Sequence, residues 1–404
     1  MNARARPILI AGAGIAGLTA ALAFARCGFS VRVFEQAPRI EVVGAGLQLS
    51  PNATHILQRL GVLDRLAPAA VRPRGVVLKD AESLRTLTTV PLGDAAERRW
   101  KAPYLVAHRA DLQQALLQRV ANESGIDLLT GARVRRVNAG EHAIGITVEA
   151  DGKSVEFDGA LLVGADGVWS TVRAATGLGA TSAFTGELAW RTTVEASSPA
   201  GKAFAGIGVP GSVTAFLHPG FHLIAYPVSR GEAFNLVAFT KGERIAEGWS
   251  GKADPELLRQ AMGRTAPALA RLAGEAGPWL AWPLHTVDRR HPWTSARGIA
   301  LIGDAAHAMT PFAAQGAAMA IEDAATLAGH VAGPADLPHA LAAWERERKP
   351  RVDKVARRGA LNHLAWHATG PVALARNLFL KTRAPERLAA DLDWLYGWRA
   401  PQDA

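Results

Sequence analysis

The spacing of apolar residues at the start of the chain predicts a strand, a helix and a second strand. Residues 7–11 form a short apolar run typical of a buried strand, and residues 15–26 predict an apolar helix that Gly28 closes. Residues 30–34 form the next apolar run. Because both runs lack alternating polar positions, we expect parallel strands buried on both faces.

The pattern changes further along the chain. Around 76–92 and again over 213–240, β-branched residues alternate with polar ones between glycines, which predicts an antiparallel sheet. A strand followed by a helix returns over 298–331. Beyond Leu341 the chain is expected to be helical, with breaks at Pro350, Gly370 and Pro371. A nucleotide-binding unit interrupted by an inserted sheet domain accounts for this order.

Composition narrows the class of protein. The 404 residues are 49% hydrophobic and 20% charged, which excludes intrinsic disorder and allows about two or three domains. The single cysteine, Cys27, cannot form an internal disulfide or a thiolate metal cluster, so we expect a reducing, cytoplasmic location.

Two segments leave other readings open. Residues 7–25 are uncharged and mostly apolar, as in a signal peptide or membrane anchor, but the regularly spaced glycines favour a turn and no integral membrane segment. Residues 346–358 carry seven basic and two acidic side chains. Because aromatic and polar base-reading residues are not interleaved with them, this run indicates a solvated helix face and no nucleic-acid partner.

The sequence GAGIAG at 12–17 lies between the first strand and the helix. Gly12 permits a tight turn, Gly14 lets a pyrophosphate approach the backbone, and Gly17 lets the helix pack on the strand. Glu35 ends the next strand, where a carboxylate accepts hydrogen bonds from a ribose and disfavours a 2′-phosphate. A glycine-rich structural turn is the alternative, and both FAD and NAD share this pattern.

Two further segments follow apolar strands: GADGVWSTVR at 164–173, and GDAAHAMTP at 303–311, which leads through Gln315 and Gly316 into a helix. With these three motifs in this order, nearly the whole chain resembles the group A flavoprotein aromatic hydroxylases. The resemblance implies bound FAD, with NADH or NADPH as a transient reductant. It also implies that O₂ adds at flavin carbon 4a and that one oxygen of the hydroperoxide is transferred to an aromatic ring.

The resemblance also assigns residues to the cofactor. Gly12, Gly14, Gly17 and Glu35 resemble the ADP end of the site, and Asp166 and Asp304 resemble the aspartates that brace FAD and bind its ribitol hydroxyls. Arg109 resembles an arginine near the ribityl-phosphate region. Pro311, and Gly46 and Leu47 in the loop 44–48, resemble residues beside the flavin ring. Surface capping remains the alternative for Arg109, and a turn aspartate before glycine for Asp166.

The position of Gly316 has an independent physical argument. A helix beginning near Gln315 would direct its backbone N–H groups toward the N1 and C2 carbonyl edge of the flavin, where the reduced ring is negative. Glu322 and Asp323, further along that helix, are expected to be packing or solvent-facing residues.

The candidate substrate residues lie elsewhere. On a strand at 221–227, His222, Ile224 and Tyr226 share one face, and His222 resembles the base that deprotonates a phenol or hydroxypyridine. A core histidine is the alternative, and a metal pair with His218 is disfavoured by distance along the strand. Gln48 and Arg191 are pocket candidates. Arg191 is expected either to bind an acidic substrate or to join a structural ion pair.

These observations predict an α/β protein: a Rossmann-type FAD domain (1–74, 100–180 and 285–345), an inserted, mainly antiparallel substrate domain (75–99 and 181–284) and a C-terminal helical region (346–404). The expected function is FAD-dependent hydroxylation of a small phenolic or hydroxypyridine carboxylate with NAD(P)H and O₂. A non-hydroxylating flavin oxidoreductase or redox module is the alternative, and an NAD-dependent dehydrogenase leaves two motifs unexplained. No metal is expected, and a homodimer is possible on this evidence.

Overall fold

The computed structural model describes residues 6–40, 46–140, 143–243 and 254–400, in which two large sheets organise the chain. The first has the order β17–β18–β11–β1–β2–β7, with bounds Thr294–Ser295, Ile299–Leu301, Leu161–Gly164, Ile8–Ala11, Val31–Glu35 and Ile126–Thr130. Its strands pair in parallel, except that β17 runs antiparallel to β18. Every residue of β1 and β11 is buried, so the apolar runs form the centre of this sheet, as predicted.

The second sheet has seven strands in the order β16–β12–β15–β14–β13–β4–β5. Their bounds are Leu280–Val287, Ser182–Glu195, Ala233–Lys241, Phe221–Val228, Val213–His218, Gly75–Asp80 and Thr86–Pro91. All neighbours are antiparallel except β4 and β13, which join distant parts of the chain in parallel. The predicted fold class, a parallel nucleotide-binding sheet with a mainly antiparallel second sheet and C-terminal helices, is confirmed.

Two smaller sheets complete the strand arrangement. One consists of β8 to β10 at Ala132–Ala139, Ile144–Ala150 and Lys153–Gly159, and the other pairs β3, Gly46–Leu49, with β6, Leu105–His108. The helices of the first 300 residues are α1 Ile15–Arg26, α2 Pro51–Arg59, α3 Leu63–Leu66, α4 Asp94–Trp100, α5 Arg109–Ala121, α6 Thr171–Thr176, α7 Pro199–Ile207, α8 Pro255–Ala261 and α9 Pro267–Glu275. The later ones are α10 Asp304–His307, α11 Gly316–Ala332, α12 Leu337–Trp366, α13 Gly370–Thr382, α14 Pro385–Ala390 and α15 Asp393–Tyr396, with short 3₁₀ turns η2 at Ser229–Gly231 and η3 at Pro311–Ala313.

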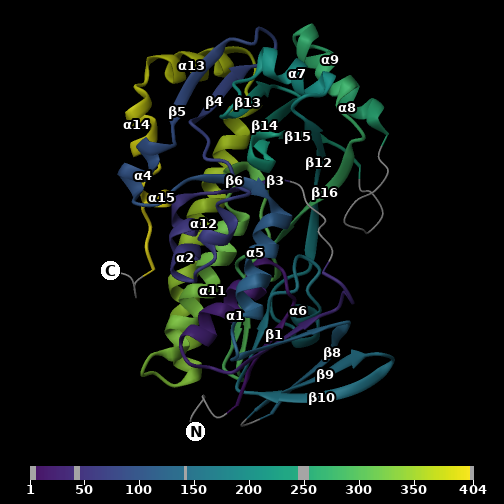
Figure 1. Cartoon of the computed structure of the whole chain (residues 1–404), viewed down its shortest axis with the longest axis vertical. Helices are drawn as coiled ribbons and strands as arrows, with labels where there is room; N and C mark the ends of the chain where they lie inside the picture. Colours follow the sequence, from purple (N-terminus) through teal and green to yellow (C-terminus); the bar gives the residue numbers. More distant parts are fainter. Residues whose placement is uncertain (1–5, 41–45, 141–142, 244–253, 401–404) are drawn as a thin grey trace.

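Figure 1 shows how these parts lie in the molecule. The seven-stranded sheet and helices α7 to α9 occupy one end, β8 to β10 occupy the other, and α1, α11 and α12 lie between them. Helix α1 packs against α11, which brings the beginning of the chain beside a segment some 300 residues later. The domain boundaries given above stay a prediction. No helix in the described part of the chain is both long enough and apolar enough to span a membrane.

The expected break at Pro350 is wrong, because α12 continues unbroken from Leu337 to Trp366. Proline removes one backbone hydrogen bond and normally kinks or ends a helix. Here the inward side of α12 is held by burial of Trp344, Val352 and Val355, so tertiary packing outweighs the lost bond. The expected break near Gly370 is found, since α12 ends at Trp366 and α13 begins at Gly370.

The interpretation of residues 346–358 as a solvated face is also wrong at two positions. Arg348 is fully buried, and only 9% of the Arg351 side chain is exposed. Their partners are Glu322 and Asp323, which are buried rather than solvent-facing. A run of like charges gives no sign of partners 25 to 29 residues away.

Candidate active site

A cavity of about 340 Å³ lies between the nucleotide-binding unit and the seven-stranded sheet. One wall, the cofactor wall, is formed by the loop after β1, strand β3, and the beginnings of α5, α10 and α11. The opposite wall, the sheet wall, is formed by β12, β14, β15 and β16. Of the sequence-predicted site residues, those that line the cavity are Gly14, Gly46, Leu47, Gln48, Arg109, Arg191, Tyr226, Asp304, Pro311 and Gly316.

The glycine-rich turn shows three different uses of glycine. A Cβ at Gly17 would lie 1.9 Å from the Gly12 carbonyl oxygen, and one at Gly12 would lie 2.6 Å from the Ala165 carbonyl oxygen. These two glycines therefore permit close packing behind the cavity rather than lining it. Gly14 lines the cavity and has open space where a Cβ would point, which suits the approach of a ligand to the backbone.

Glu35 lies at the end of β2 and fixes the same turn. One carboxylate oxygen accepts a 2.8 Å hydrogen bond from the Ala13 backbone N–H, and the other accepts a 2.9 Å bond from the Ala37 N–H. Glu35 is not part of the cavity lining. Its position beside the turn supports its assignment to the ribose end of a dinucleotide, which stays a prediction.

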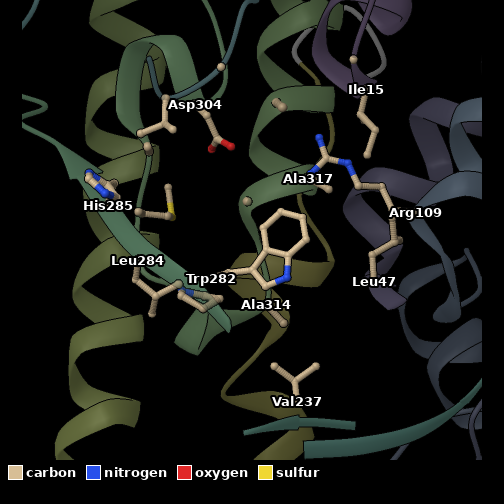
Figure 2. A pocket seen from close by; sticks show the side chains of 18 of the residues that line it. Ile15, Leu47, Arg109, Val237, Trp282, Leu284, His285, Asp304, Ala314 and Ala317 are labelled. Carbon is tan, nitrogen blue, oxygen red and sulfur yellow. The ribbon is translucent and has the colours of Figure 1, made fainter. Parts of the chain in front are cut away.

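Arg109 and Asp304 each occupy the first position of a helix. Arg109 begins α5 and Asp304 begins α10, and Figure 2 shows their side chains on opposite sides of the cavity, with Trp282 between them in the view. The turn before Asp304 depends on Gly303, whose φ of +58° is in the region that favours glycine. The two charged groups are thus held apart by rigid elements on the cofactor wall.

Asp166 is placed differently from the expectation of direct contact with a ligand. Its carboxylate accepts hydrogen bonds from the Ser170 hydroxyl and from the Val172 N–H at 3.0 Å, at the start of α6. Burial raises the pKa of Asp166, and these hydrogen bonds oppose that effect. Its neighbours Gly167 and Trp169 line the cavity instead, so Asp166 holds their loop in place.

The beginning of α11 faces the cavity with backbone groups. Gln315 is the N-cap, Gly316 is the first helical residue, and Gly316 and Ala317 both line the cavity. The first N–H groups of a helix lack partners within the helix and carry partial positive charge. This end of α11 is therefore suited to a ligand edge that bears negative charge. Pro311 lies in the turn η3 just before it and also lines the cavity.

Arg191 is the outstanding polar group on the sheet wall. It lies on β12, its guanidinium carbon is 5.3 Å from the ring centroid of Trp282, and its Nε has no hydrogen-bond partner within the described residues. No acidic side chain in that part of the chain forms an ion pair with it. Burial lowers the pKa of Arg191, the Tyr226 phenol opposes that change, and Arg109 adds to it. A buried guanidinium without a carboxylate favours an anionic ligand.

Tyr226 lies beside Arg191 on the sheet wall and contacts the other wall. Burial raises its pKa, so the phenol stays neutral at ordinary pH. A Cβ at Gly46 would lie 2.8 Å from the Tyr226 hydroxyl oxygen, and the Gly46 N–H donates a 2.7 Å hydrogen bond to Asn235. The two walls therefore meet at Gly46. Gln48, on the same strand, accepts a 2.7 Å hydrogen bond from the Tyr104 hydroxyl, and Gly44 and Ala45 of the predicted loop lie outside the described residues.

His222 is not in the cavity lining, in contrast to the expectation of a base that faces the substrate. Its ring stacks on Phe239 at 4.5 Å, and its Nδ1 lies 3.1 Å from Nε2 of His367. Burial lowers the pKa of His222 well below its usual range, and His367 and His363 lower it further. The two-residue period correctly put His222 on the face of Ile224 and Tyr226, but Phe312 and the end of α12 cover that end of the strand.

Several lining residues were missed at the sequence level. Strand β16 contributes Trp282, Leu284 and His285, β15 contributes Val237 and Phe239, and the remainder include Trp169 and Met309. Most are ordinary strand residues with no motif around them. The only available signal was the period of two, which places alternate residues of β16 on one face.

Comparison with known proteins identifies the family. A model of the FAD binding domain family matches residues 5–359. The 3-hydroxybenzoate 6-hydroxylase of Polaromonas naphthalenivorans strain CJ2 is 34% identical over 396 residues, which span 97% of this chain and 96% of that protein. The chain is a group A flavoprotein aromatic hydroxylase.

Other relatives agree with this assignment. The 3-amino-4-hydroxybenzoate 2-monooxygenase of Streptomyces cremeus is 34% identical to this flavoprotein over 398 residues, covering 96% of this chain and 94% of that protein. The structure of a salicylate hydroxylase substrate complex has the same fold, with a TM-score of 0.82, 22% identity and coverage of 98% and 97%. The predicted cofactors of the family, FAD and NAD(P)H, are confirmed.

The cofactor wall of the hydroxylase fits FAD by its own geometry. Open space at Gly14, a carboxylate at Asp304, a guanidinium at Arg109 and the N-terminus of α11 provide donors and acceptors along one side of the cavity. The roles of the individual residues stay predictions.

Proposed function

We propose that this flavoprotein hydroxylates a small aromatic ring that carries a carboxylate and a phenolic or hydroxypyridine oxygen, with NADH or NADPH as the reductant. The observation that carries the proposal is Arg191. It is a guanidinium buried beside Trp282, with no carboxylate partner among the described residues. A carboxylate on the substrate would neutralise it through charge-assisted hydrogen bonds.

The chain's own residues would divide the work between the two walls. Gly14, Arg109, Asp304 and Gly316 would hold FAD, which when reduced reacts with O₂ and supplies the oxygen atom. Arg191 would hold the carboxylate and orient the ring. The Tyr226 phenol, neutral because burial raises its pKa, would donate a hydrogen bond to a ring oxygen.

The apolar lining would exclude water from the reacting groups. Ile224, Val237, Phe239 and Leu284 surround the two polar side chains on the sheet wall. Exclusion of water favours transfer of oxygen to the ring over loss of H₂O₂. The names of the two relatives, both of which act on hydroxybenzoates, support a substrate of this class.

The test is a matched panel of aromatic compounds on the purified, flavin-containing protein. Carboxylated phenols and hydroxypyridines should stimulate NAD(P)H oxidation and yield hydroxylated product, whereas the same rings without the carboxylate should yield mainly H₂O₂. Stimulation only by uncarboxylated rings would contradict the substrate class. Production of H₂O₂ alone with every compound would indicate a non-hydroxylating oxidoreductase.

Arg191→Met should lower kcat/KM for the carboxylated substrate by about 100-fold, on the order of 2 to 4 kcal/mol, because a buried charge loses its partner. Binding of FAD should be unchanged, since Arg191 belongs to the sheet wall. Arg289→Met is the matched control, because Arg289 pairs with Asp353 and does not line the cavity. An equal loss in both variants would show that positive charge in general, and not Arg191, attracts the substrate.

A further inference from the structure

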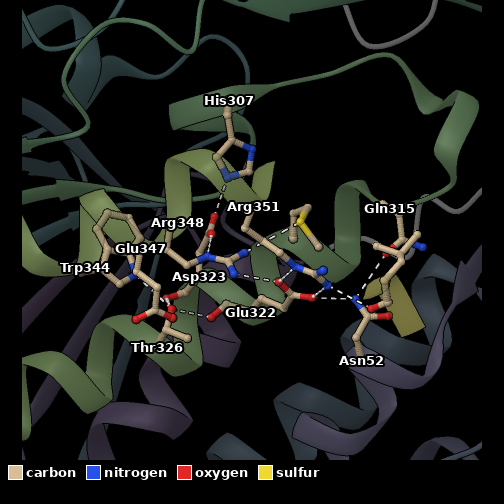
Figure 3. A network of polar contacts seen from close by, with 12 residues as sticks. Asn52, His307, Gln315, Glu322, Asp323, Thr326, Trp344, Glu347, Arg348 and Arg351 are labelled. Carbon is tan, nitrogen blue, oxygen red and sulfur yellow. Dashed lines mark hydrogen bonds and ion pairs between the residues drawn. The ribbon is translucent and has the colours of Figure 1, made fainter. Parts of the chain in front are cut away.

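Two adjacent carboxylates of α11 and two guanidinium groups of α12 form a buried network, drawn in Figure 3. Arg348 donates to Glu322 at 2.7 Å and to Asp323 at 2.9 Å, and these three side chains are fully buried. Arg351 donates to both oxygens of Glu322, at 2.7 and 3.1 Å. Two negative and two positive charges therefore face one another behind the cofactor wall.

Such a network is an expensive way to join two helices. Each charge loses its hydration, and apolar residues of similar volume often stabilise a protein equally well or better. Burial by itself raises the pKa of Asp323, but His307 and Arg348 outweigh that effect and hold it at about 2. Asp323 is therefore a carboxylate at ordinary pH, and the hydrogen bonds it makes outside the network become the relevant question.

At one end, the network holds the turn that precedes Asp304. The second oxygen of Asp323 accepts a 3.0 Å hydrogen bond from the Gly303 backbone N–H and lies 2.5 Å from His307 Nε2. Gly303 and His307 bracket α10, whose first residue, Asp304, lines the cavity. Asp323 thus fixes both ends of the short helix that presents Asp304.

At the other end, the network reaches the beginning of α11 through Asn52. The Asn52 amide donates to Glu322 at 2.6 Å and to the Gln315 side-chain oxygen at 3.3 Å. Gln315 in turn donates to the Ser50 hydroxyl at 3.0 Å. Gln315 caps α11 next to Gly316, and Ser50 follows β3, which lines the cavity at residues 46–48. Figure 3 shows Asn52 and Gln315 at one side of the network and His307 at the other.

We propose that Glu322, Asp323 and Arg348 are positioning residues for FAD, which set the distance between the turn at Asp304 and the first N–H groups of α11. Arg348 fixes the two carboxylates relative to each other, Asp323 positions the Asp304 side, and Glu322 positions the Gly316 side through Asn52. The inference rests on the proposed placement of FAD between these two segments. It does not depend on the identity of the aromatic substrate.

The competing explanation is that the charges only join α11 to α12. The double variant Asp323→Leu/Arg348→Met separates the two, because it removes one charge of each sign and leaves the Glu322–Arg351 pair in place. Thermal unfolding of the apoprotein should remain cooperative. The dissociation constant for FAD, measured by titrating the apoprotein and following flavin fluorescence, should rise by about tenfold or more, as when supporting partners are lost at metal sites.

The Glu322 side predicts a different readout. Asn52→Leu cuts the link between Glu322 and Gln315 while preserving the ion pairs. Because the N-terminus of α11 would stabilise the negative charge of reduced flavin, the midpoint potential of the bound flavin should fall in this variant. In Asp323→Asn, which keeps the shape of the side chain and serves if the double variant does not fold, the FAD dissociation constant should rise severalfold with a smaller change in potential.

Thr326→Val is the matched control. Thr326 lies one turn further along α11, is fully buried, and accepts a 3.0 Å hydrogen bond from Trp344 of α12, so its loss weakens the same helix pair without reaching either cofactor segment. If the double variant and Asp323→Asn bind FAD as Thr326→Val does, or if Asn52→Leu leaves the potential unchanged, the positioning role is wrong. None of these measurements uses the aromatic substrate, so a wrong substrate class would not affect them.

Discussion

The cofactor wall presents backbone groups to the cavity, whereas the sheet wall presents side chains. On the cofactor wall, Gly14, Gly46 and Gly316 contribute no side chain at all, and the ligand is met by N–H groups and two charged residues at helix starts. On the sheet wall, Arg191 and Tyr226 stand among branched and aromatic residues. The same cavity therefore has one side shaped by the fold and one side shaped by individual residues.

This difference bears on how each wall responds to substitution. The backbone of the cofactor wall is fixed by close packing and by buried ion pairs, so a change there disturbs the protein as well as the ligand site. A side chain of the sheet wall can change with little effect on strand pairing, since its neighbours are the cavity and its partner ring. The sheet wall is thus the side on which substrate choice can vary within one fold.

The largest expected effect is on the cofactor wall. Gly17→Ala places a methyl group 1.9 Å from the Gly12 carbonyl oxygen, where only backbone movement can relieve the clash. We expect a loss of about 3 kcal/mol in the free energy of unfolding, together with loss of bound flavin. Denaturant unfolding and the flavin absorbance of the purified protein measure both.

Gly14→Ala is the control for the same turn, because nothing lies within 4 Å of the added Cβ. It should leave the stability of the apoprotein unchanged and weaken only the binding of FAD. Equal destabilisation by the two substitutions would mean that close packing does not distinguish these glycines.

An intermediate effect is expected on the sheet wall. Tyr226→Phe removes one hydroxyl from the cavity and should lower kcat/KM by about tenfold, which corresponds to one hydrogen bond of about 1.4 kcal/mol. The FAD dissociation constant should stay at its original value. A change in FAD binding without a change in kcat/KM would place the hydroxyl against the cofactor instead.

The smallest effect concerns the histidines behind the sheet wall. Burial and the nearby His363 lower the pKa of His367 from 6.5 to about 4, so the folded protein holds this ring neutral. The unfolded chain takes up the proton first as the pH falls, so the stabilisation is complete above pH 6.5 and is lost progressively between 6.5 and 4.

His367→Gln should make that acid-side loss of stability shallower by about 1 kcal/mol, allowing for partial exposure of the ring. Thermal unfolding midpoints between pH 4 and 7 provide the comparison. Parallel curves for the two proteins would show that His367 carries no part of the loss.

The sequence predicted the cofactor wall better than the sheet wall, for a physical reason. Turns that need glycine and helix starts that face a ligand are local features, so GAGIAG and the segment at Asp304 can be recognised from neighbouring residues alone. The face of His222 was also predictable from the strand period. That Phe312 and His367 cover this face depends on segments about 90 and 145 residues away, which no local pattern reports.

Charge posed the same difficulty. A basic run such as 346–358 is commonly solvated, and only the pairing of Arg348 with Glu322 and Asp323 explains its burial. The helical period alone would have placed Arg348 in line with Trp344 and Val352, both buried on the inward side of α12. A charged residue in register with buried apolar ones was therefore the available signal.

Arg351 also donates to the backbone carbonyl oxygens of Trp394 and Leu395, at 2.7 and 3.0 Å. During synthesis on the ribosome, the glycine turn at 12–17 emerges early, yet α11 and these carbonyls emerge only after some 300 further residues. The segments that meet at the cavity therefore cannot assemble while the chain is short. The apolar β1 and α1 must wait without α11, so the nascent chain is expected to depend on protection by chaperones until late in translation.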